Sequence, residues 1–546
     1  MTNRTNSNFL VRLLPSLSDV AFLFPVIFVF YGLHGSGRLI EGDTGWHVRT
    51  GQWILEHGRI PYADPFSYTK PGQPWFAWEW LWDVISATLH SRWGMEAVVL
   101  ASLFVACLTY LLVFRLCARV SGNVIVSIAV TWLTAGLGSM HWWARPHMVT
   151  FLFLAIVLWI VTLAEEGRRG WLWLLPLLMA VWVNIHGGFL AGIIVLGAWT
   201  ASYLIQALVS TAPEIRTSSL RSAAQYALVA AVCAAATLLN PYGWRLHAHM
   251  FEIISTSGEF FNQTIQEWQS FNFNSTAGLY YVPLLLLGAA AAWTNLLRGR
   301  YAVTLLLAAW FWMGLKSARN APVYALIAAP WITAFLSEQL LALANSRLAG
   351  WIRNAAAELV SISEEFGETD RVPRFMLLSF GAWAVLILLT WSPNPPKKLR
   401  ADYEPHLYPT NAVNYIRHSA VPAPIFTHDE WGDYLIYRLY PDGRVYMDGR
   451  FDFYGKEFTN RYSNVMNGKH DWESNLEQFD VQSVLLPVDA SLASTLKESR
   501  HWRVVYDDGV AIIFERARVT AVSPNMLTAS GQSALSGYLV VDKNNK

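Results

Sequence analysis

Long apolar runs alternate with short polar connections over the first 391 residues of the chain. A helix needs roughly 20 apolar residues to cross a bilayer, and about eleven runs approach this length. The pattern therefore predicts a polytopic α-helical membrane protein. The predicted spans are residues 19–38, 95–116, 122–140, 146–164, 170–185, 188–209, 223–240, 279–297, 301–317, 321–342 and 374–391. No small-residue cleavage site follows the first run, so we expect a retained helix there and not a cleaved signal peptide.

Basic residues in the connections predict the orientation. Arg4 and Arg12 precede the first run, and Arg recurs in every second connection. Cytoplasmic loops are enriched in Lys and Arg, so we expect a cytoplasmic N-terminus. An odd number of crossings then places everything after Trp391 outside the membrane. The cytoplasmic connection 343–373 is predicted to contain an amphipathic helix on the inner surface.

The predicted external connections carry polar side chains directly at the membrane boundary. Basic residues occur there against the usual bias, namely Arg145, Arg245, Lys316 and Arg319. Any one of them alone is explained by snorkelling toward lipid headgroups. Several helix ends that bring cations and aromatic rings to one face favour a different interpretation. Such a surface suits a lipid phosphate, because Arg and Lys are the side chains that bind phosphate.

The segment 41–51, EGDTGWHVRTG, opens the first external loop, 41–94. Transfer of a sugar to a hydroxyl or amine needs a carboxylate beside the acceptor, acting as general base or as a metal ligand. Asp43 is the candidate for this role. The alternative is that Asp43 caps a helix that begins near Thr44 and lies along the interface. The two roles are compatible.

This arrangement resembles the GT-C superfamily of polytopic membrane glycosyltransferases. It is also similar to a bacterial glycosyltransferase-like group over 42–83, from GDTGWHVRTGQWIL to KPGQPWFAWEWLWD. Glu41-Gly42-Asp43 resembles the acidic motif of the superfamily's first external loop, whose Asp is catalytic. The resemblance implies transfer, with inversion, of a sugar from a polyprenyl-phosphate or polyprenyl-diphosphate carrier to an external glycan, lipid or protein. It also implies the inner membrane of a bacterium.

The resemblance assigns roles to further residues. Asp43 and Glu41 would be catalytic. The expected donor-phosphate and substrate-binding residues are Arg145, His147, His186, Arg245, Lys316, Arg319, Asn320 and Glu79. A divalent metal, Mg or Mn, is a further expectation, with Asp43, His247 and His249 as candidate ligands. Two histidines at i and i+2 diverge on a helix and share a face on a strand.

Residues 392–516 are predicted to form an external α/β domain after the transmembrane domain, 1–391. Expected strands are 423–428, 443–449, 481–488, 502–508 and 509–516, and expected helices are 431–440, 471–479 and 491–499. The stretch 448–455, DGRFDFYG, is predicted as a loop, either an acceptor contact or an ordinary turn. Residues 517–546 form a polar tail.

Composition narrows the function classes. The chain is 54% hydrophobic and 14% charged, against about 25% charged residues in soluble proteins. A net charge of +1 gives no reason to expect nucleic acid as a partner. A lipid or polysaccharide transporter, a non-catalytic envelope assembly protein and a polysaccharide ligase or polymerase remain alternatives. A transporter is expected to break its helices near mid-membrane, whereas the polar groups here gather at one face.

Overall fold

The computed structural model describes residue 9 and residues 11–33, 35–255, 260, 265–370 and 374–517. In this part of the chain, eight helices are long and apolar enough to cross a membrane, and three further apolar helices are shorter. They match the predicted spans one by one. The helices of the bundle are α2 (Leu17–Ile27), α5 (Met95–Ser121), α6 (Val124–Gly138), α7 (His147–Glu165), α8 (Leu175–Trp182), α9 (Phe189–Val209), α10 (Pro213–Ala236), α13 (Gly278–Leu297), α14 (Tyr301–Lys316), α15 (Ala321–Ala344) and α17 (Leu377–Thr390).

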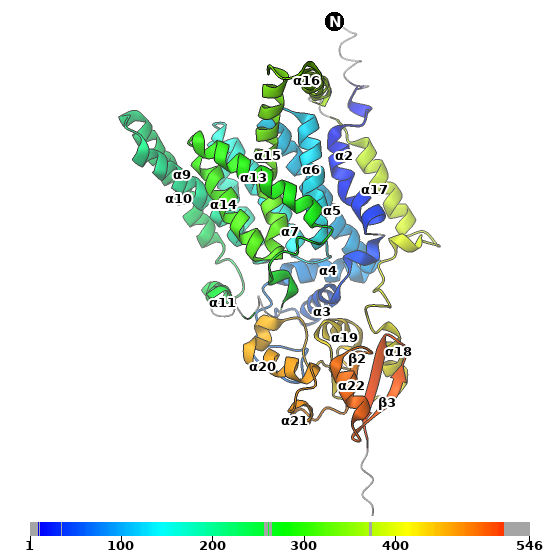
Figure 1. Cartoon of the computed structure of the whole chain (residues 1–546). Coiled ribbons are helices and arrows are strands. Elements are labelled where there is room, and N and C mark those ends of the chain that lie inside the picture. Colours follow the sequence, from blue (N-terminus) through cyan, green and yellow to red (C-terminus); the bar gives the residue numbers. More distant parts are fainter. Residues whose placement is uncertain are drawn as a thin grey trace, which may run out of the picture.

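The first and last helices of the bundle lie side by side (Figure 1). Ser16 caps α2, and the Asp19 side chain in its first turn accepts hydrogen bonds from the Ser379 backbone N–H and hydroxyl at 3.0 and 2.7 Å. A carboxylate inside a bundle is stable only when such partners satisfy it. The α5 helix packs against α2, α7 and α15 and forms the centre of the bundle.

Two shorter helices, α3 (Gly42–His57) and α4 (Trp80–Trp93), lie between the bundle and the C-terminal domain (Figure 1). They approach closely because Gly51 has no side chain. A Cβ at Gly51 would lie 1.9 Å from the backbone oxygen of Asp83. The helix that was expected to begin near Thr44 is present as α3. The expectation that Asp43 caps it is wrong, because Glu41 is the cap residue and Asp43 lies inside the first turn.

The C-terminal domain contains a four-stranded sheet in the order β1-β2-β4-β3. The strands are β1 (Ile425–Thr427), β2 (Ser483–Pro487), β3 (Trp502–Asp507) and β4 (Ala511–Arg516). The β1–β2 pair is parallel and the other two pairs are antiparallel. The helices are α18 (Thr410–His418), α19 (Asp429–Leu439), α20 (Phe451–Met466), α21 (Trp472–Gln478) and α22 (Ser491–Glu498). A layered α/β domain with a partly parallel sheet was expected and is present.

Two local predictions in this domain are wrong. Residues 443–449 form no strand, because Val445 makes only isolated bridges to Ser67 and Ile425. The predicted loop 448–455 continues into α20, which begins at Phe451 and kinks at Gly455. The helix predicted within 343–373 is present as α16 (Gly350–Asp370), at the end of the bundle opposite the C-terminal domain (Figure 1). Its cytoplasmic location stays a prediction. The polar tail from residue 518 onward lies outside the described residues.

Candidate functional site

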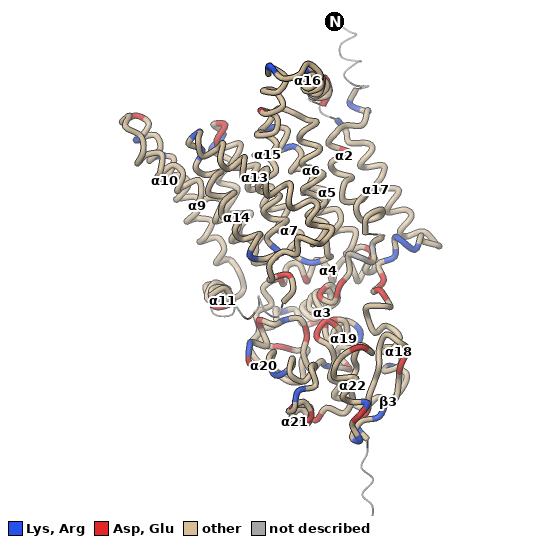
Figure 2. Tube along the Cα trace, viewed as in Figure 1, with Lys and Arg blue, Asp and Glu red and all other residues tan. Residues whose placement is uncertain are grey.

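Acidic residues gather along the chain where the bundle, α3 and the C-terminal domain meet (Figure 2). Arg145, just before α7, lies among them. Its Nη1 lies 2.9 Å from Glu41 Oε1, and its Nη2 lies 2.6 Å from Asp43 Oδ2. The indole N–H of Trp46 donates to Asp43 Oδ1 at 3.2 Å. Both oxygens of Asp43 are thus held by donors, in the first turn of a helix whose dipole favours negative charge.

Glu41 and Arg145 lie beside Asp43 and differ in the charge state that the site favours. Burial raises the pKa of Glu41 to about 8, against the lowering effect of Arg145. Burial would lower the pKa of Arg145, but the carboxylates of Asp43, Glu41 and Glu267 raise it well above its ordinary value. Arg145 therefore stays charged, and Glu41 gains a proton near neutral pH.

The raised pKa of Glu41 predicts a pH dependence of stability. Between about pH 4.5 and about 8 the folded state binds more protons than the unfolded state, so the free energy of unfolding falls as pH rises and levels off above pH 8. The slope from one such group is at most about 1.4 kcal/mol per pH unit. We expect Glu41→Gln to flatten the decline of Tm between pH 5 and 8.5, measured by thermal unfolding in detergent. If Tm declined with pH as steeply in Glu41→Gln as in wild type, the raised pKa of Glu41 would be contradicted.

A second group of side chains extends from α3 into α4 and the loop before α9. His47 Nδ1 lies 2.6 Å from Asp83 Oδ1, with both side chains 1% exposed. Glu79 lies between two histidines: its Oε2 is 3.7 Å from His47 Nε2, and its Oε1 is 3.8 Å from His186 Nε2. The predicted residues Glu79 and His186 thus come together, while His47 and Asp83 join them without having been assigned a role.

A third group surrounds Glu267, a carboxylate that the sequence interpretation missed. Its oxygens lie 3.7 Å from Arg319 Nη1 and 3.8 Å from His141 Nδ1. Burial opposes ionisation, but Arg319 and Arg145 outweigh it and lower the pKa of Glu267 to about 2. The Arg319 guanidinium also lies over the Trp268 ring at 4.8 Å. The predicted residue His147 makes a 2.7 Å hydrogen bond to the backbone oxygen of His141.

The C-terminal domain reaches directly to Asp43. A Cβ on Gly449 would lie 3.0 Å from Asp43 Oδ1 and 2.7 Å from Asp433 Oδ2, on α19. Asp433 is buried, and its Oδ1 accepts a hydrogen bond from the Gly449 N–H at 3.0 Å. Gly42, which separates the two acids of the motif, is required by the same packing. A Cβ there would lie 2.8 Å from the Glu430 backbone oxygen.

Three predicted residues lie apart from these groups. Arg245 and Lys316 are exposed. Asn320 donates to the backbone oxygen of Met313 at 3.5 Å. Their proposed part in substrate binding stays a prediction.

The two histidines suggested as metal ligands lie on α11 (Trp244–Ser255) and face different partners. His247 Nε2 lies 2.8 Å from the Thr237 hydroxyl. His249 Nε2 lies 3.4 Å from Asp452 Oδ2. Residues i and i+2 of a helix point in different directions. The two histidines are therefore not placed to bind the same metal ion.

The donor set around Asp43 does not fit Mg or Mn as it stands. Hard divalent cations need several converging oxygen ligands, and the described residues contain no group of three or more His, Cys, Asp or Glu side chains placed to hold a metal ion. Both Asp43 oxygens already accept from Arg145 and Trp46. The cation beside the two acids in this structure is Arg145.

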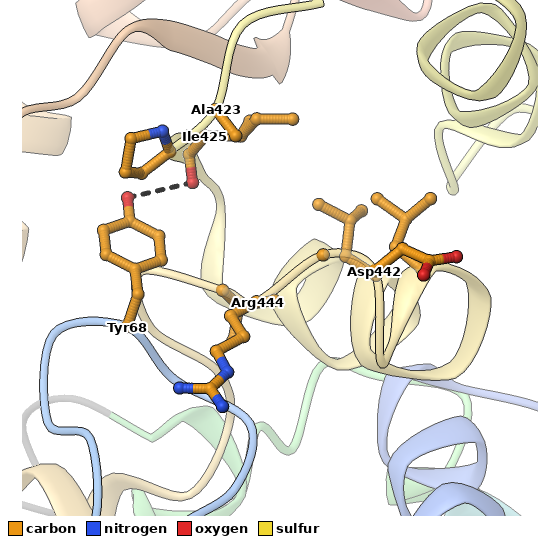
Figure 3. Close-up of a pocket in the computed structure, with 10 residues that line it drawn as sticks. Tyr68, Ala423, Ile425, Asp442 and Arg444 are labelled. Carbon is orange, nitrogen blue, oxygen red and sulfur yellow. Dashed lines mark hydrogen bonds between the residues drawn. The ribbon is translucent and has the colours of Figure 1, made fainter.

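A separate cavity of about 140 Å³ lies between the loop 41–94 and the start of β1. Tyr68 donates to the Ile425 backbone oxygen at 3.1 Å across it, and Arg444 and Asp442 lie at its edge (Figure 3). Neither Asp43 nor Arg145 lines this cavity.

Comparison with known proteins rests on structure, because no family model and no curated protein matches the chain. The oligosaccharyltransferase of Archaeoglobus fulgidus, solved with a tethered acceptor peptide, superimposes with a TM-score of 0.51 at 13% identity, covering 92% of this chain and 74% of that one. Its apo form gives 0.50 at the same identity and coverage. ArnT from Cupriavidus metallidurans bound to undecaprenyl phosphate gives 0.47 at 14% identity, covering 92% and 98%. The chain thus has the fold of the GT-C superfamily of polytopic membrane glycosyltransferases.

Proposed function

We propose that the chain is a membrane glycosyltransferase that moves a sugar from a polyprenyl-phosphate or polyprenyl-diphosphate carrier to an extracytoplasmic acceptor. The observation that carries the proposal is Asp43, fixed on one oxygen by Arg145 and on the other by Trp46 at one end of a GT-C bundle. The location in a bacterial inner membrane, with the C-terminal domain outside, belongs to the same proposal.

The chemistry follows from the position of this carboxylate. Asp43 takes the proton from the acceptor O–H or N–H as that atom attacks the anomeric carbon of the sugar. The bond between that carbon and the phosphate oxygen breaks, and its electron pair stays on the phosphate. Arg145 and Arg319 supply positive charge to the departing phosphate, and such preorganised cations stabilise developing charge strongly. A single displacement of this kind inverts the anomeric centre.

The decisive test is sugar transfer by purified protein in liposomes, with a panel of polyprenyl-linked sugars and acceptors. Asp43→Asn keeps the size of the side chain and removes the base, so we expect the rate to fall by about 10²- to 10⁴-fold. Glu56→Gln is the matched control, because Glu56 lies on the same helix and is exposed. It is expected to transfer at the wild-type rate.

Two results would contradict the proposal. Equal rates for wild type and Asp43→Asn would remove Asp43 from the mechanism. Movement of the lipid across the bilayer without sugar transfer by wild type would favour a transporter.

A further inference from the structure

Four titratable side chains beside the proposed base have no part in the mechanism above. Asp83, His47, Glu79 and His186 form one line, in which each neighbours the next. His47 and Asp83 are 1% exposed, and Glu79 is 13% exposed. Ionisable groups are seldom buried together without a function or a full set of partners.

The hydrogen bonds of His186 fix which of its nitrogens carries the proton. The Gly188 N–H donates to His186 Nδ1 at 3.0 Å. The Thr150 hydroxyl lies 2.9 Å from the same nitrogen and itself accepts from the Trp182 indole at 2.9 Å. Nδ1 is therefore an acceptor, and the proton of the neutral ring lies on Nε2. That N–H faces Glu79 Oε1.

The other side of Glu79 is connected to the proposed base. His47 Nδ1 and Asp83 Oδ1 form a hydrogen bond of 2.6 Å, and Asp83 Oδ2 is buried without a hydrogen bond within the described residues. His47 Nε2 faces Glu79 Oε2. The Trp46 ring stacks on His47 at 3.9 Å and donates to Asp43. Glu79 thus has a histidine on each side, and one of them stacks on the indole that donates to Asp43.

Burial favours the neutral form of Glu79. Burial raises its pKa to about 8, with Asp43 and Asp452 raising it and Arg145 and Arg319 lowering it. The two histidines facing it are His47 and His186. At neutral pH Glu79 therefore holds a proton, within electrostatic reach of Arg145 and Arg319.

We infer that Glu79 is the general acid of the reaction and protonates the departing phosphate, while His47, Asp83 and His186 position it. This inference rests on the proposed function. As the sugar–phosphate bond breaks, the Glu79 O–H bond breaks and an O–H bond forms on the leaving phosphate oxygen. Asp43 has meanwhile gained the acceptor proton. Return of that proton from Asp43 to Glu79 restores both groups, so each cycle releases one protonated phosphate and consumes no further reagent.

The test is the pH profile of the transfer rate for wild type and Glu79→Gln in liposomes, between pH 6 and 9.5. The wild-type rate is expected to fall above about pH 8 as Glu79 ionises. Glu79→Gln cannot donate this proton, so its rate is expected to be about 10²-fold lower and to show no decline above pH 8. A matched control is Glu56→Gln, which should keep the wild-type profile.

A wild-type rate in Glu79→Gln overturns the inference, and so does a lower rate that still declines above pH 8, since that marks a structural role. If Glu79→Gln does not fold, His186→Asn replaces it and is expected to shift the decline to a different pH. An unchanged decline there overturns the inference. Absence of transfer by wild type would overturn the proposed function itself, a result distinct from the others.

Discussion

Arg450→Met is expected to release the C-terminal domain from the rest of the molecule. Arg450 is 3% exposed and lies between two buried carboxylates. Its Nη1 is 2.9 Å from Asp64 Oδ1 in the first external loop, and its Nη2 is 2.7 Å from Asp448 Oδ2. Its guanidinium also lies 4.6 Å from the Trp75 ring. Removing one partner of a buried ion pair costs about 3–5 kcal/mol, and this substitution leaves two carboxylates unpaired.

Limited proteolysis and Tm in detergent measure the effect. We expect rapid cleavage near residues 392–400 in Arg450→Met, with loss of sugar transfer because Gly449 and Asp433 leave Asp43. Arg461→Met is the control. Arg461 pairs with Glu457 on the surface, and such pairs contribute at most about 1 kcal/mol. Neutralising Asp64 and Asp448 together with Arg450 should restore part of the stability. A wild-type Tm for Arg450→Met would show that the triad does not hold the domain.

The transmembrane part of the fold was predictable because a bilayer leaves few choices. A run of about 20 apolar residues must satisfy its backbone internally, and a helix does this. The α10 helix shows the limit, since it begins at Pro213, before the predicted span. Its first turns are polar, so hydropathy gave no signal for them. The α20 helix was missed for a related reason, because Gly455 interrupts it and was interpreted as part of a turn.

Residues of the candidate site were predictable only where they departed from the usual distribution of basic residues in membrane proteins. Arg145 and Arg319 were found because basic residues are unusual at external helix ends. Glu267 and Asp433 break no such rule, since acids are ordinary outside the membrane-spanning segments. Their place beside Arg319 and Asp43 depends on packing between distant segments. The same packing explains Gly42, which local sequence shows only as an interruption between two acids.

Arg145→Met is expected to reduce sugar transfer by more than about 10³-fold. Arg145 pairs with Glu41 and Asp43, and Glu267 and Glu79 also lie within its electrostatic reach. Loss of one preorganised group that stabilises transition-state charge costs about 10²- to 10³-fold. A second loss adds to it, because Arg145 Nη2 holds Asp43 Oδ2 at 2.6 Å. Without this contact the proposed base is no longer fixed in its position.

Arg145→Lys separates the two effects. Its single ammonium keeps the charge but cannot place two fixed N–H groups on Glu41 and Asp43, so its rate should fall between wild type and Arg145→Met. In Arg145→Met, both the positive charge and the fixed N–H groups are lost. Arg59→Met is the control, because Arg59 is exposed just after α3 and has no assigned role. Rates within tenfold of wild type for Arg145→Met would show that the ion pairs at Arg145 maintain structure and not catalysis.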